Sequence, residues 1–351
     1  MKRRNSGILF VLAAMALLLS GCSKDGDAAY KEGVNALTVQ EYDLAIEKLQ
    51  EAYDAGSNRE RTMRALGLAY MGEERYSEAV LAFEEALKEA GTSTGELECD
   101  INYYMAVSLS KLGEYDEAIS RLDSVIALRP ADRQALVQRG QLELYLGDKE
   151  TAKADFDKAV AVKKSDAGIY IDIYDAYVKR GMESEGAEYL SAAKNADSGK
   201  LNDLDKGRLC FYTGDYEGAC NYLEYARSTQ QSGPELIGLL GRCYCLREKY
   251  ENATAIYLGY LEENPDPTIY NELGLCYVTE GDYASAAEAF HNGSEIKEKN
   301  TYMQILKHNE IVCLEYMGEY EQAAALAAEY IDTYGDEGGL MSKEYDFLYT
   351  R

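Results

Sequence analysis

The chain has 351 residues, enough for two globular domains or one extended array, and 46% of them are hydrophobic, which excludes a disordered polymer. Four prolines, no tryptophan and 31 tyrosines favour a mostly helical protein rich in large packing side chains. The formal net charge of −26 argues against nucleic acid as a partner, because affinity for phosphates comes from clustered Lys and Arg.

Residues 1–21 have the pattern of a signal peptide. A basic start, Lys2 to Arg4, precedes an apolar run from Ile8 to Leu19 that is too short to span a bilayer. The run leads into Leu19-Ser20-Gly21-Cys22, which resembles the lipobox of bacterial lipoproteins. The resemblance implies that Cys22 is lipid-modified and becomes the first residue of the mature chain. We therefore expect an exported protein, lipid-anchored on the extracytoplasmic side of a bacterial membrane; an uncleaved signal anchor or a buried thiol is the alternative.

After a short linker at residues 22–28, a pattern of small and large residues recurs with a period near 34. The stretch ELGLCYVTEGDYASAAEAF (272–290) repeats the spacing of LGLAYMGEERYSEAVLAF (66–83). One column of small residues marks the start of a second helix, at Ala45, Ala79, Ala118, Ala152, Gly186, Ala219, Ala253, Ala286 and Ala323. A first small column precedes it, at Gly33, Gly67, Ala106, Gly140, Tyr174, Gly207, Gly241, Gly274 and Ile311.

These columns resemble the tetratricopeptide repeat, whose unit is a helical hairpin. The resemblance implies an all-α, right-handed α-solenoid of about nine hairpins over residues 29–338. Residues 339–351 are expected to form a short capping helix and tail, with Leu340, Phe347 and Leu348 covering the last repeat. Tyr174 and Ile311 interrupt the first small column, so we expect the fifth and ninth hairpins to pack less tightly or to tilt.

No catalytic residue is nominated by the sequence, which contains no Gly-rich phosphate loop, HExxH, GxSxG or metal-spaced cysteine set. We therefore expect a protein that is not an enzyme and that holds no metal or other cofactor. The two histidines, His291 and His308, lack a placed carboxylate or thiolate between them, so the pattern favours ordinary surface histidines.

The cysteines after Cys22 favour buried, reduced thiols. Cys243, Cys276 and Cys313 occupy one repeat position. Equivalent positions in stacked hairpins lie roughly 10 Å apart, too far for a disulfide, which needs Cα atoms within about 7 Å. Cys210 and Cys220 flank the turn of one hairpin and remain a candidate pair.

In this repeat family the concave surface is formed mostly by first helices, at positions three before and one and four after the first small column. Those positions are mostly apolar and aromatic with a few arginines, and the acidic residues are expected on second helices and turns. The candidate groove residues are Tyr30, Arg64, Tyr103, Arg208, Phe211 and Arg242.

Two arginines of this groove, Arg208 and Arg242, would suit a carboxylate ligand, although pairing with nearby acids inside the array is the favoured interpretation. The carboxylate-clamp subgroup of the family is not matched, because Tyr30 and Val34 stand where Lys and Asn would be.

The expected function is a membrane-anchored extracytoplasmic scaffold that binds an unidentified protein or peptide in the groove, with a role in cell-envelope assembly. The alternative is a lipoprotein that captures a solute, either a peptide or a glycan. The absence of Trp disfavours a sugar binder, whose platforms are aromatic, although Tyr could substitute.

Overall fold

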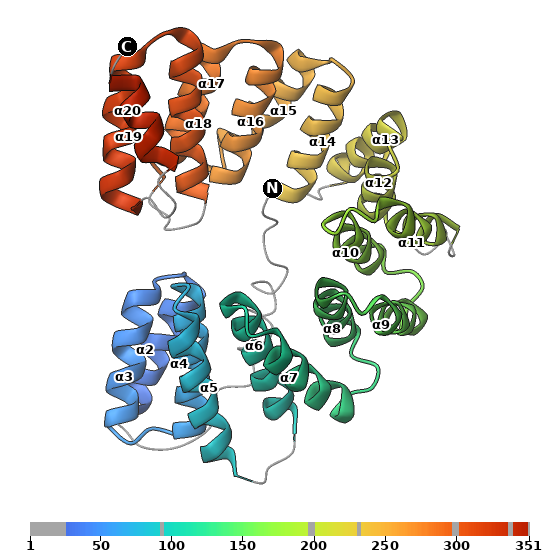
Figure 1. Ribbon diagram of the computed structural model, residues 1–351, viewed down its shortest axis with the longest axis vertical. Helices are drawn as coiled ribbons and strands as arrows, with labels where there is room; N and C mark the ends of the chain where they lie inside the picture. The colour runs from blue at the N-terminus through green and yellow to red at the C-terminus, as the bar shows by residue number, and fades with distance from the viewer. Residues whose placement is uncertain are drawn as a thin grey trace. The chain divides into compact units, whose positions relative to one another are not determined.

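The computed structural model describes residues 26–91, 95–195, 201–229, 233–296, 302–335 and 340–349, and every regular element in these ranges is an α-helix (Figure 1). The predicted signal peptide and Cys22 lie outside the described residues. Within these ranges nine first helices alternate with nine second helices, and a final helix follows them, which confirms the predicted all-α solenoid of nine hairpins.

The first helices are α2 (Gly26–Thr38), α4 (Arg59–Gly72), α6 (Glu96–Leu112), α8 (Arg133–Leu146), α10 (Ala167–Val178), α12 (Asp203–Tyr212), α14 (Pro234–Leu246), α16 (Pro267–Glu280) and α18 (Tyr302–Met317). The second helices are α3 (Tyr42–Asp54), α5 (Tyr76–Ala90), α7 (Tyr115–Leu128), α9 (Lys149–Val162), α11 (Glu183–Asn195), α13 (Tyr216–Ser228), α15 (Tyr250–Leu261), α17 (Tyr283–Ser294) and α19 (Tyr320–Tyr334). The final helix is α20 (Leu340–Tyr349).

The chain divides into two compact units within its fifth hairpin, α10–α11. The first unit holds α2 to α9 together with residues 172–186, and the second holds residues 165–171 and 187–351, including α12 to α20. In each unit every helix packs against the next one along the chain. Successive hairpins thus stabilise one another, as in other repeat proteins.

Close approach of the two helices in a hairpin depends on a glycine that faces a large side chain. A Cβ atom added at Gly67 would lie 2.5 Å from the ring of Phe83, and one at Gly140 would lie 2.6 Å from the ring of Phe156. Both phenylalanines are completely buried. The absence of a side chain at the first small column is therefore what lets the facing ring fill the space between the helices.

The two hairpins without a small residue in this column reverse the arrangement. In the fifth, a Cβ added at Gly186 would lie 3.1 Å from both the ring and the carbonyl oxygen of Tyr174, so glycine on the second helix makes room for tyrosine on the first. In the ninth, Ile311 is fully buried in one cluster with Ala327, which stands where other hairpins have Leu, Phe or Tyr. In both hairpins a small residue on the second helix thus faces the larger one on the first, and looser packing or a tilt of these hairpins stays a prediction.

The turn between the two helices has the same backbone conformation in all nine hairpins. Seven residues after the first small column the chain adopts a positive φ, at Gly113 (82°) or Gly281 (88°) for example. The next residue donates its N–H to a carbonyl five residues back, as Glu114 does to Leu109 at 2.9 Å. This is the Schellman end of a helix, and Gln40, Glu74 and Glu248 adopt it without glycine.

The last helix covers the end of the second unit. α20 packs against α19, and Met341 and Leu348 are buried in one cluster with Ile311, Ala323 and Ala327. This confirms the predicted capping role for Leu348. Only the backbone of Leu340 and Phe347 is described, so the predicted capping role of their side chains stays a prediction.

The seventh hairpin offers a matched pair of glycines with which to test the close-approach constraint. Gly241→Ala should lower the free energy of unfolding by about 1–3 kcal/mol, because the new methyl group would overlap the fully buried ring of Tyr257. Gly259→Ala, on the exposed face of α15 with nothing within 4 Å, should raise it by up to about 1 kcal/mol through helix propensity. Urea denaturation followed by far-UV circular dichroism measures both, and equal effects would contradict the explanation.

Candidate binding site

The first helices of the second unit lie side by side, because α12 contacts α14, α14 contacts α16, and α16 contacts α18. The residue directly after the first small column is half-buried or exposed on all four helices, whereas the residue three before the column is buried on α14 and α16, half-buried on α12 and exposed on α18. The former column is therefore the one that is accessible on every one of these helices. We call its members on these four helices the first-helix stripe: Arg208, Arg242, Leu275 and Val312.

The structure separates the six predicted groove residues into two groups. Tyr30, Arg64 and Phe211 are buried, with 8%, 1% and 8% of their surfaces exposed. Tyr103, Arg208 and Arg242 are half-buried. Contact with a ligand stays a prediction for all six, but the buried three would have to move to make it.

Arg64 is an interior residue with an incomplete set of partners. Its Nη2 donates to Oδ2 of Asp100 at 2.9 Å, and its guanidinium carbon lies 5.8 Å from the centre of the Tyr104 ring. Its Nε and Nη1 have no hydrogen-bond acceptor among the described residues, and the hydroxyl of Tyr30 has no partner there either. Burial raises the pKa of Tyr30, and the nearby positive charge of Arg64 opposes that shift.

The two arginines of the first-helix stripe are paired with acids inside the array, as the favoured interpretation predicted. Nε of Arg208 lies 3.0 Å from Oε1 of Glu235, without the geometry of a hydrogen bond, and its Nη1 lies 3.5 Å from Asp205. Nε of Arg242 lies 3.8 Å from Glu272, and its guanidinium carbon lies 4.7 Å from the centre of the Phe211 ring. Their charge is therefore largely compensated, so no strong anion site results.

Glu272, the partner of Arg242, lies in a partly desolvated position. Burial raises the pKa of its carboxyl group, and Arg242 opposes that shift. The stripe therefore contains a charge pair at Arg242 and becomes apolar at Leu275, which has 43% of its surface exposed.

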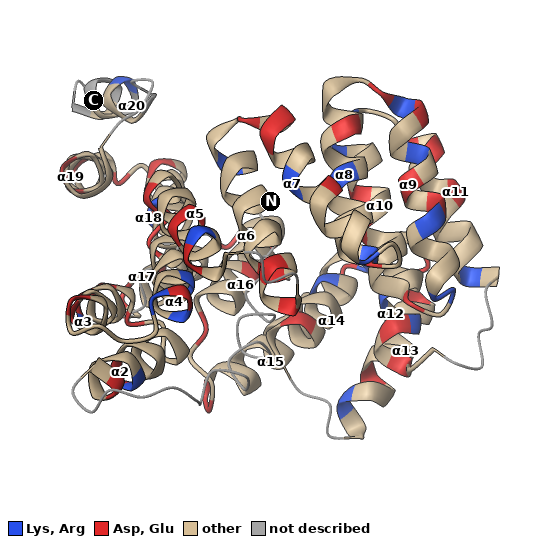
Figure 2. Cartoon of the chain, turned by 90° about the horizontal axis from the view of Figure 1, so that it is seen from below, with Lys and Arg blue, Asp and Glu red and all other residues tan. Residues whose placement is uncertain are grey.

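Acidic residues are more numerous on second helices, as expected, and Figure 2 shows Asp and Glu along many of the helices. The nine first helices carry 16 acidic and 11 basic residues, whereas the nine second helices carry 24 and 8. The negative charge thus lies mainly on the helices that do not contribute to the stripe. A negatively charged partner would therefore be repelled less by the first helices than by the second helices.

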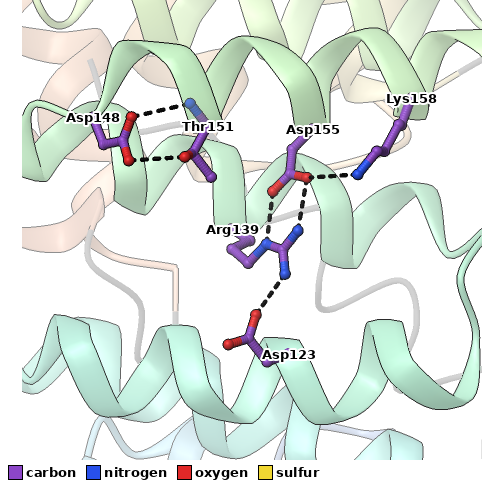
Figure 3. Close-up of polar contacts among 6 residues, drawn as sticks. All are labelled: Asp123, Arg139, Asp148, Thr151, Asp155 and Lys158. Atoms are coloured by element: carbon purple, nitrogen blue, oxygen red, sulfur yellow. Dashed lines mark hydrogen bonds and ion pairs between the residues drawn. The ribbon is translucent and has the colours of Figure 1, made fainter.

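A polar cluster in the first unit joins three helices (Figure 3). Arg139 of α8 donates two hydrogen bonds of 2.7 Å to the carboxylate of Asp155 on α9, and it also pairs with Asp123 of α7. Asp155 is 1% exposed, and Lys158 lies 4.0 Å from it. The cluster ties the third hairpin to the fourth, and its carboxylates are paired with Arg139 and Lys158.

The described cysteines are free thiols, as the favoured interpretation of the sequence has them, and six of the seven are buried. Cys210 and Cys220, the candidate pair, have different neighbours: Cys210 interacts with Asp215 and Cys220 with Cys243. Nδ1 of His291 lies 3.1 Å from Glu310. Within the described ranges, no three His, Cys, Asp or Glu side chains converge as metal ligands.

The sequence missed the pairing of Cys245 with Cys276. The Sγ atoms of these residues lie 2.6 Å apart on neighbouring first helices. The available signal was the offset of the two residues: Cys245 stands four residues after the first small column of its hairpin, and Cys276 stands two residues after that of the next hairpin.

Comparison with known proteins places these features in a family. The family model described as tetratricopeptide repeat matches residues 30–94, 103–168 and 247–291, about half of the chain. A TPR repeat-containing protein of Methanocaldococcus jannaschii, MJ1428, is 25% identical over 75% of this chain and 42% of its own length. The TPR repeat-containing protein YpiA of Bacillus subtilis is 23% identical over 63% of this chain and 61% of its own. The chain therefore spans less than two thirds of either relative.

A solved structure is similar in fold. The crystal structure of a tetratricopeptide repeat protein from Parabacteroides merdae is 17% identical, with a TM-score of 0.47 over 83% of this chain and 100% of the other. Among the described helices, none is both long enough and apolar enough to cross a membrane.

The polar cluster of Figure 3 should contribute to stability rather than to activity. Asp155→Ala should lower the free energy of unfolding of the first unit by about 3 kcal/mol, the lower end of the range for breaking a buried ion pair, because Arg139 keeps Asp123. The matched control on the same helix, Asp157→Ala, removes a carboxylate that is 53% exposed and should change it by less than about 0.5 kcal/mol. Urea denaturation compares the two, and an Asp155 variant as stable as the control would refute the structural role.

Proposed function

Because the chain belongs to the tetratricopeptide repeat family, whose members generally serve as protein-interaction scaffolds, we propose that it is a membrane-anchored scaffold for a protein or an extended peptide. In this proposal the lipid on Cys22 holds it on the extracytoplasmic side of a bacterial membrane, where it takes part in cell-envelope assembly. The lipobox-like end of the leader, Leu19 to Cys22, supports the anchor.

The observation that carries the binding role is the exposed apolar end of the first-helix stripe. Leu275 is 43% exposed on α16, and Val312, at the equivalent position of the adjacent helix α18, is half-buried. Arg242, on the other side, is paired with Glu272 and stacks on Phe211, so its side chain is already held in place. An ordered, mixed surface of this kind suits a peptide segment that brings an apolar side chain to Leu275, because little side-chain entropy is lost on binding.

The negative charge of the repeat region is consistent with attachment through a lipid on Cys22 rather than with adsorption of the repeats on a lipid surface. Removal of residues 1–21 would take away three positive charges and no negative ones, so a mature chain would be more negative than the −26 of the full sequence. Anionic headgroups repel such a surface. The repeats would then stand away from the membrane, with the first-helix stripe open to partners.

Two leucines that are exposed to a similar extent, one on the stripe and one on a second helix, allow the two surfaces to be compared. A photo-crosslinking amino acid at position 275, on α16, should capture a defined partner in living cells, because that side chain lies on the stripe. The same group at position 258, on α15, should not, although Leu258 is 46% exposed against 43% for Leu275. The measurement is gel analysis and mass spectrometry of the cross-linked products.

Loss of the product in a Leu275→Asp variant carrying the crosslinker at position 312 would support the stripe as the site. Equal capture from positions 275 and 258, or no capture from either under several growth conditions, would contradict the scaffold role. The solute-capture alternative predicts instead a rise in melting temperature with a free peptide or glycan and no protein cross-link.

The anchor has its own test in the leader. In a bacterium that processes lipoproteins, a clickable fatty acid should label the wild-type chain, and the labelled chain should fractionate with membranes. The Cys22→Ser variant should lose the label, because it lacks the thiol that accepts the lipid. A control variant, Cys313→Ser, should keep it. Detection of residues 1–21 on the wild-type protein by mass spectrometry would refute the proposed processing.

A further inference from the structure

Two cysteines on neighbouring first helices of the second unit lie close enough to react with each other. Cys245 is near the end of α14 and Cys276 is in the middle of α16, and these helices pack directly together. Their Sγ atoms are 2.6 Å apart. Non-bonded heavy atoms have their optimal separation at roughly 3.5–4.0 Å. The two sulfur atoms are thus closer than the packing of separate thiols would favour.

The other buried thiols of this unit show that the contact is not a general property of the repeat. Cys313 occupies the repeat position of Cys276 in the next hairpin and is equally buried, at 1% against 2% exposed. Within the described ranges Cys313 has no sulfur neighbour of this kind, and burial raises the pKa of its thiol to about 11. Cys276 has a close sulfur neighbour on a first helix because the preceding hairpin places a cysteine four residues after its first small column, at Cys245, whereas Cys243 interacts instead with Cys220 of α13.

We propose that Cys245 and Cys276 form a disulfide that covalently joins the seventh hairpin to the eighth. The bond would close a loop of 31 residues and restrain the unfolded chain. In a repeat array, where each hairpin depends on its neighbours, a covalent link across one interface stabilises both hairpins. The inference does not require the export proposed above, because the oxidant can be supplied to the purified protein.

The chemistry balances by thiol–disulfide exchange with a small-molecule disulfide as the oxidant. Cys245, which is half-buried, loses its proton and attacks one sulfur of that disulfide, and one thiolate leaves. Cys276 loses its proton and attacks Sγ of Cys245 in the mixed disulfide, and the second thiolate leaves. Two protein thiols are oxidised, and one disulfide is reduced to two thiols. The contact between the two thiols raises the pKa of Cys245 and lowers that of Cys276, so the first attack is set by the greater exposure of Cys245 and the second is favoured by the lowered pKa of Cys276.

The test is peptide mapping of the folded full chain, purified in detergent. The protein is treated with oxidised glutathione, the remaining free thiols are alkylated, and the protein is digested with trypsin. The expected product joins the peptide of residues 243–247 to that of residues 250–297, and it disappears on reduction. Recovery of both peptides in fully alkylated, unlinked form would overturn the proposal.

Because Cys243 and Cys245 share one tryptic peptide, three variants assign the bond. Cys243→Ser should keep the cross-linked product, whereas Cys245→Ser and Cys276→Ser should lose it. The opposite pattern, with loss in Cys243→Ser alone, would overturn the assignment. Far-UV circular dichroism confirms that each variant is folded, and Cys245→Ser, at a half-buried position, keeps the test valid if Cys276→Ser does not fold.

Stability supplies an independent readout. Oxidised wild-type protein should unfold at a higher urea concentration than reduced protein, and the difference should persist in Cys313→Ser, the matched buried control. It should vanish in Cys276→Ser. Equal midpoints for oxidised and reduced wild-type protein would contradict a bond that ties the two hairpins together.

Discussion

The structure depends on how closely the two helices of each hairpin approach one another. At Gly67 and Gly140 the first helix has no side chain, and the ring of a phenylalanine on the second helix occupies the space. This separation sets where the apolar face of each hairpin meets the next. The fifth and ninth hairpins instead place a large side chain on the first helix opposite a small residue on the second, Gly186 or Ala327.

This constraint explains which parts of the molecule were predictable. Repeat spacing, hairpin number, positive-φ turns and the capping role of Leu348 all arise from local patterns of size and periodicity that a sequence displays directly. The sequence does not predict the compensation of Tyr174 by Gly186, because the two residues stand twelve positions apart on different helices. Only the structure shows that the two residues face each other across one contact.

The candidate site was less predictable, because exposure is decided by neighbouring helices. Arg64 and Arg242 look alike in the sequence, and both stand at positions that line a groove in this repeat family. Arg64 is three residues before its small column and is enclosed, whereas Arg242 is one residue after and is half-buried. Which acidic residues pair with an arginine also depends on the tertiary structure. Arg139 pairs with Asp123 on one side and with Asp155 on the other, each 16 residues away in the sequence. A sequence with 62 acidic residues does not single out these two.

The turns have a consequence for how such a chain can change length. All nine connections inside hairpins end the first helix with the same left-handed residue and the same hydrogen bond, even where Gln40, Glu74 or Glu248 replaces glycine. The two longer steps in the repeat spacing instead fall between hairpins, before α6 and before α18, the two longest helices of the described chain. Insertions are thus accommodated at the junctions between modules. The turn inside each hairpin keeps one conformation, so longer loops between hairpins can arise without disturbing the pairing of the two helices within a hairpin.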